Sequence, residues 1–121
     1  MKALFPVALV LVGCSGGIQE SPPQEWRDLQ VRVESRSYSP IPGMQELLVL
    51  VNRNHTLPAW DCRVDLRTAD QDPWKQAIED GHVGVYRRAV KVDALHSILQ
   101  VWIHTEGTQA VLKFPLKIAS S

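Results

Sequence analysis

The amino-acid sequence predicts an all-β domain of antiparallel strands with one short helical insert, over residues 26–118. Apolar and polar residues alternate along several short segments, a period of two that is typical of half-buried strands. Clusters of Gly, Pro, Asn and Asp separate these segments, as turns do in antiparallel sheets. The chain has 121 residues, 45% of them hydrophobic, which suits a single domain with a packed core.

The first half of this domain contains three predicted strands. Residues 28–34 alternate regularly between apolar and polar side chains, and residues 46–51 contain a nearly continuous apolar run that predicts a central strand covered on both faces. Residues 60–68 carry apolar residues on one face and charges of alternating sign on the other. A slip by one residue would bury four charges, so this register is firmly specified. Because Cys62 lies on the apolar face, we expect a buried, unreactive thiol and not a nucleophile.

Residues 70–81 carry the signals of the short helical insert. Asp72 suits the N-terminal cap of a helix, and Gly81 suits the C-terminal cap. Trp74 and Ile78 are four residues apart, which would place both side chains on the buried side of the helix.

The C-terminal part of the domain returns to strands. Residues 82–92 predict a strand with a bulge at Arg87 and Arg88, where the alternation breaks, and residues 98–104 and 109–118 predict a hairpin. A proline near the end of the last strand cannot donate to a ladder, so that strand should lie at a sheet edge. The whole pattern, in about 95 residues, predicts an immunoglobulin-like antiparallel β-sandwich of about seven strands.

The first fourteen residues have the features of an export signal. Lys2 supplies a positive charge, and residues 3–12 form an apolar run too short for a membrane-spanning helix, which needs about 20 residues. The residues Leu11-Val12-Gly13-Cys14 come next. The alternative is a buried N-terminal strand with a core cysteine, but the run does not alternate, and a Gly/Ser stretch follows it at once.

Residues 11–14 resemble the bacterial lipobox. The resemblance implies that residues 1–13 are a cleaved signal peptide and that Cys14 carries lipid, which would anchor the protein in the cell envelope with the domain facing the periplasm. Residues 14–25, rich in Gly, Ser, Pro and Gln, would then be a flexible tether. Ser15 resembles the outer-membrane and not the inner-membrane signal of enterobacterial lipoproteins.

A second resemblance covers residues 40–117. Its stretches are Pro42-Gly43-Met44-Gln45-Glu46-Leu47-Leu48-Val49, Ala59-Trp60-Asp61-Cys62-Arg63-Val64, Gly84-Val85-Tyr86, Leu99-Gln100-Val101-Trp102 and Lys113-Phe114-Pro115-Leu116. They resemble the FixH and YtkA-like envelope modules, which are immunoglobulin-like. This resemblance implies an accessory role, in some relatives the assembly or copper supply of respiratory oxidases. FixH proteins carry a transmembrane anchor, whereas this chain has a lipobox and lacks a Met/His-rich copper loop.

A copper-binding role predicts a site built from Met44, His55, His82 and His104. Copper favours His together with Met or Cys ligands, and Met44 and His55 flank the second predicted strand. No two of the four histidines have the His-x-His or the i, i+4 spacing of many metal sites. Surface histidines without a metal are therefore the alternative interpretation.

Trp74 and Trp102 are the candidate partner-binding residues. Trp102 is out of phase with Val101 and Ile103, so it faces outward beside His104 if those two residues face the core. An exposed aromatic side chain on a sheet face is typical of a protein interface. The alternative is that Trp102 packs under the helical insert with Trp74.

Charge and motif content limit the function classes. The formal net charge is +0, with 13 basic and 13 acidic residues, which gives no electrostatic basis for nucleic-acid binding. The sequence shows no nucleophile–base–acid constellation and no phosphate-binding loop, so we do not predict an enzyme. We expect a non-enzymatic binding or accessory lipoprotein for a periplasmic or membrane protein partner. The alternative is a copper-binding or metal-delivery accessory protein for oxidase assembly.

Overall fold

The computed structural model of the protein describes residues 18–19, 22–35, 43–54, 57–59, 61–81 and 83–118. Within these ranges the fold is all-β, as predicted, and every strand pairing is antiparallel. The strands are β1 (Ile18–Gln19), β2 (Gln24–Trp26), β3 (Leu29–Ser35), β4 (Gly43–Arg53), β5 (Leu57–Pro58), β6 (Arg63–Arg67), β7 (Lys75–Gln76), β8 (Ile78–Glu79), β9 (Val85–Val92), β10 (Ile98–Thr105), β11 (Thr108–Pro115) and β12 (Lys117–Ile118).

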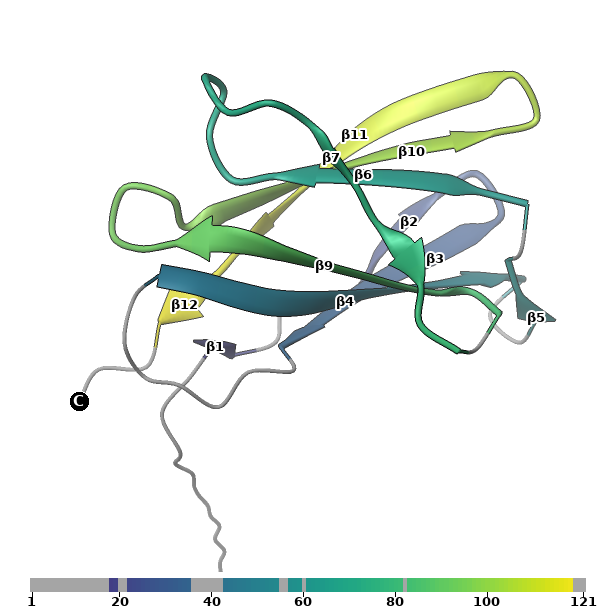
Figure 1. The fold of residues 1–121 in the computed structure, drawn as a ribbon. Coiled ribbons are helices and arrows are strands. Elements are labelled where there is room, and N and C mark those ends of the chain that lie inside the picture. Colours follow the sequence, from purple (N-terminus) through teal and green to yellow (C-terminus); the bar gives the residue numbers. More distant parts are fainter. Residues whose placement is uncertain are drawn as a thin grey trace, which may run out of the picture.

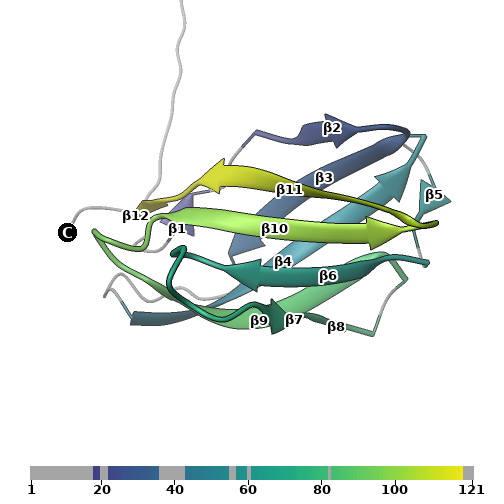
Figure 2. The ribbon, with the colours of Figure 1, turned by 90° about the horizontal axis from the view of Figure 1, so that it is seen from above.

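The strands form two layers that face each other (Figures 1 and 2). One layer is a six-stranded sheet in the order β2-β3-β4-β9-β8, with β5 paired to β4. The other layer is a four-stranded sheet in the order β11-β10-β6-β7. A short third ladder pairs β1 with β12 beside one end of the layers.

The core lies between the two layers and follows the period-two pattern of the strands. In β3 the buried residues are Leu29, Val31 and Val33, as the alternation predicts. In β10 the three apolar residues at every second position from Leu99 are fully buried, and Phe114 of β11 is the largest fully buried side chain of the described residues. Each of these strands therefore has one face in the core.

The strand β4 differs from its prediction. Leu47 and Val49 are fully buried, whereas Leu48 and Leu50 are only half-buried. The strand is central in its sheet, but no second layer covers its outer face in the described part of the chain. A continuous apolar run alone does not distinguish a strand covered on both faces from one with a partly exposed apolar outer face.

The predicted helical insert is wrong, because residues 70–81 form turns and two short strands. β7 joins the four-stranded sheet and β8 joins the six-stranded sheet, so this segment crosses from one layer to the other. The crossing residue, Ala77, is buried, and its N–H donates to the Val64 carbonyl at 2.8 Å. Strand pairing on both sides satisfies this backbone, and tertiary pairing of this kind overrides weak local helix signals.

The predicted bulge at Arg87 and Arg88 is also absent. The ladder between β4 and β9 runs without interruption from the pair Gly43 and Val92 to the pair Leu50 and Val85. Arg87 fits this regular ladder because its guanidinium lies 3.0 Å from carboxylates of both Glu46 and Asp80. The break in apolar alternation therefore does not come from an extra residue in the ladder.

The C-terminal hairpin agrees with the prediction. β10 and β11 pair from Ile98 and Pro115 to Thr105 and Thr108, across a two-residue turn. Both turn residues, Glu106 and Gly107, have positive φ, which matches the right-handed twist of the flanking strands. β11 is an edge strand, so the missing N–H of Pro115 costs no ladder hydrogen bond.

Two short parts of the N-terminal segment lie in strands. The predicted tether of residues 14–25 contains β1, in which Ile18 is the partner of Ile118, and most of β2. Within the described residues, no helix is long and apolar enough to cross a membrane.

Candidate functional site

The outer face of the four-stranded sheet carries the candidate site. On β10, Leu99, Val101 and Ile103 point into the core, so Trp102 and His104 point outward. Trp102 is only half-buried, and its cross-strand neighbours are Asp65 on β6 and Val111 on β11.

The connection between β6 and β7 brings a second tryptophan onto this face. The ring centroids of Trp74 and Trp102 are 5.1 Å apart, and those of Trp102 and His104 are 4.3 Å apart. The guanidinium carbon of Arg67 lies 4.1 Å from the Trp74 ring centroid, within cation–π distance. Arg67, Trp74, Trp102 and His104 thus form a continuous row, which we call the tryptophan face.

Both alternatives from the sequence are partly realised in this row. Trp102 faces outward, and it also packs against Trp74. The packing segment is an extended connection and not a helix. Both indoles are only half-buried, so the contact leaves part of their aromatic surface open to solvent.

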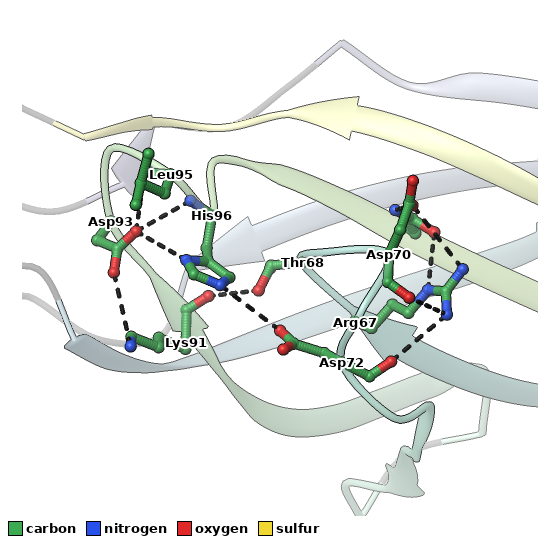
Figure 3. A network of polar contacts seen from close by, with 9 residues as sticks. Arg67, Thr68, Asp70, Asp72, Lys91, Asp93, Leu95 and His96 are labelled. Carbon is green, nitrogen blue, oxygen red and sulfur yellow. Dashed lines mark hydrogen bonds and ion pairs between the residues drawn. The ribbon is translucent and has the colours of Figure 1, made fainter.

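Hydrogen bonds fix the connection against the sheet (Figure 3). The Arg67 Nε donates to Gln100 Oε1 at 2.9 Å, and Gln100 Nε2 donates to Asp70 Oδ1 at 2.7 Å. Arg67 also donates to the carbonyl of Asp70 at 3.1 Å. Because one arginine joins β6, β10 and the connection, Trp74 is held in place before any partner binds.

The buried carboxylate of Asp65 lies next to Trp102 and His104. Asp65 on β6 is 2% exposed, and its Oδ2 lies 3.1 Å from Arg63 Nε and 3.3 Å from His104 Nε2. Asp65 forms an ion pair with Arg63 and lies close to the His104 ring, and its Oδ2 atom accepts no hydrogen bond. A buried carboxylate needs such neighbours, because burying an unpaired charge is costly. Asp65 thus lies between the side chains of Arg63 and His104.

The sequence did not reveal the burial of Asp65. Alternation correctly places Asp65 on the outer face, together with Arg63 and Arg67. Asp65 is buried because of Trp102 and other neighbours on adjacent strands, and no local sequence pattern predicts these contacts.

Beside His104 the surface forms an open hollow of about 550 Å³, which extends to the β10–β11 turn. Cys62 lines this hollow with Asp61 and Thr105. Cys62 is a half-buried free thiol, and burial raises its pKa, with a hydrogen bond from Thr105 as a smaller opposing cause. The thiol is therefore protonated at neutral pH and is not activated as a nucleophile.

Only two of the four predicted metal ligands, Met44 and His104, are among the described residues, and they lie on different sheets. Met44 lies on β4 of the six-stranded sheet, and His104 lies on β10 of the four-stranded sheet. His55, His82 and the lipidation candidate Cys14 lie outside the described residues. No group of three or more His, Cys, Asp or Glu side chains is placed to hold a metal ion within the described part of the chain.

A polar cluster at the turn between β9 and β10 was not predicted (Figure 3). Asp93 Oδ1 accepts hydrogen bonds from the backbone N–H groups of Leu95 and His96, and it lies 2.9 Å from His96 Nδ1. The His96 Nε2 lies 3.9 Å from the carboxylate of Asp72, on the β6–β7 connection. The hydrogen bond with His96 is the largest cause of a lowered pKa at Asp93. The cluster fixes the shape of this turn.

Comparisons with known proteins add no identification. No protein-family model, curated protein or solved structure matches the chain significantly.

Proposed function

We propose that this protein is a lipid-anchored envelope module with an immunoglobulin-like fold, which binds a periplasmic or membrane protein partner through the tryptophan face. In this proposal the protein has no enzymatic activity of its own. The lipobox at residues 11–14 supports the anchor, and two facing antiparallel sheets support the fold assignment. The protein acts by contact at the membrane to which Cys14 attaches it.

One observation carries the binding role: Trp74 and Trp102 lie in a row with Arg67 and His104, in tilted ring contacts, and are only half-buried. Trp and Arg are enriched among residues that dominate protein–protein binding energy. The hydrogen bonds of Arg67 hold the row rigid, which lowers the entropy lost when a partner binds. A preorganised, half-buried aromatic row of this kind suits contact with a protein surface.

A crosslinking pull-down from bacterial membranes tests this role. The lipidated protein is compared with Trp102→Ala and with Ile78→Ala, a control on the other sheet where the side chain is 54% exposed. We expect the control to recover the same partner as the unmodified protein. Trp102→Ala should recover at least about tenfold less partner, which is the effect of losing about 1.4 kcal/mol or more of binding free energy.

Folding of each variant is checked by circular dichroism, because Trp102 also packs against Trp74. Equal recovery by folded Trp102→Ala and by the unmodified protein would refute binding through this face. Failure to recover any partner above background would refute the binding role itself.

A further inference from the structure

The ladder between β1 and β12 limits the distance between the domain and its anchor. Ile18 is the first residue of β1, and only residues 15–17 separate it from Cys14. Four Cα–Cα steps reach at most about 14 Å in an extended chain. A lipid on Cys14 would therefore hold the β1–β12 end of the domain against the membrane surface.

This end of the domain also carries the most exposed apolar side chains. Leu95 in the β9–β10 turn is 88% exposed, and Met44 at the start of β4 is 60% exposed, the two highest values among the large apolar residues described. Lys91, the cross-strand partner of Met44, is also exposed. Figure 1 shows the start of β4, the end of β9 and the β9–β10 turn beside β12.

The turn presents Leu95 rigidly. Asp93 accepts hydrogen bonds from the N–H groups of Leu95 and His96, and the backbones of Asp93 and His96 bond to each other (Figure 3). A structured turn therefore holds Leu95 outward, and the described part of the domain leaves this side chain almost fully exposed.

We infer that this end of the domain rests on the lipid bilayer of the anchoring membrane, with Leu95 inserted into the headgroup region. Apolar side chains gain free energy at the headgroup–acyl boundary. The ammonium group of Lys91 lies 4.0 Å from Asp93, and the flexible stem of this exposed side chain allows it to turn toward lipid phosphates. The inference rests on the lipid anchor in the proposed function. The inference also specifies how the domain is oriented on the membrane. β10 begins at this end, so the β10–β11 turn at Glu106 and Gly107 would point away from the bilayer.

A fluorescence quenching experiment tests the orientation. The lipidated protein with Cys62→Ser is given a single labelling site, Leu95→Cys or Glu106→Cys, and an environment-sensitive dye. Each sample is reconstituted in vesicles of phosphatidylethanolamine and phosphatidylglycerol that contain a spin-labelled lipid. We expect the spin label to quench most of the fluorescence at position 95 and little of it at position 106.

Other outcomes overturn the inference in distinguishable ways. Absence of quenching at position 95, in a sample whose intact mass includes the lipid, refutes membrane contact and leaves the anchor and the tryptophan face standing. A blue shift at position 95 without quenching indicates a second copy of the chain as the cover. Equal quenching at both positions indicates a domain that lies flat. A sample without lipid mass refutes the anchor and the inference together.

Discussion

Replacing Gly84 with alanine should destabilise the fold more than an ordinary glycine substitution does. Gly84 has φ +83, and a Cβ there would lie 2.8 Å from the carbonyl oxygen of Val51 and 3.0 Å from the Cβ of Pro58. The positive φ costs alanine about 1–2 kcal/mol, and the overpacking adds about 1–3 kcal/mol. We therefore expect the free energy of unfolding to fall by about 2–5 kcal/mol.

Gly107→Ala is the matched control. Gly107 has φ +76, and a Cβ there would meet nothing within 4 Å, so only the backbone cost of about 1–2 kcal/mol applies. Urea unfolding of the two variants, followed by tryptophan fluorescence, gives the difference directly. We expect Gly84→Ala to be less stable than Gly107→Ala by about 1–3 kcal/mol. Equal stabilities would refute the close packing of Gly84 against β4.

Three further predictions concern titratable groups. Tyr86 donates its hydroxyl hydrogen to the Ala59 or the Cys62 carbonyl, so Tyr86→Phe should lower the free energy of unfolding by about 1–2 kcal/mol. Burial raises the pKa of Tyr86 to about 12, so the unmodified protein should lose stability above pH 10 in urea titrations, and an unchanged stability would contradict this. The hydrogen bond with His96 lowers the pKa of Asp93 below 3.8, so the ionised Asp93 stabilises the fold above that pH, and this stabilisation is lost as the pH falls further. The free energy of unfolding should therefore fall less steeply with acid in Asp93→Asn, and identical curves would contradict a stabilising role of the polar cluster. The raised pKa of Cys62 predicts slow labelling by a thiol reagent at neutral pH, and labelling as fast as a free cysteine would contradict it.

Strand positions were predictable where the apolar pattern directly reports burial. In β3 from Leu29 to Glu34 and in β10 from Leu99 to His104, the inward residues are apolar and the outward residues are polar or aromatic, so a period of two specifies both the strand and its face. The C-terminal hairpin was predictable for a second reason, because Gly107 permits the positive φ of its tight turn. One local signal was enough in each case.

The crossing segment was not predictable, because its structure depends on distant partners. Asp72 and Gly81 are good helix caps, yet β7 pairs with β6 and β8 pairs with β9. The same limit applies to the site: alternation places Trp102 and Asp65 on the outer face, but the ring contact with Trp74 and the burial of Asp65 arise only when the strands assemble.

Intact-mass spectrometry of the protein purified from bacterial membranes tests the lipid anchor most directly. The account predicts a chain that begins at Cys14 and carries the added mass of a diacylglyceryl group, with or without a further acyl chain. A chain that retains Met1 and has no acyl mass would contradict the anchor, the membrane orientation and the envelope role that depends on them.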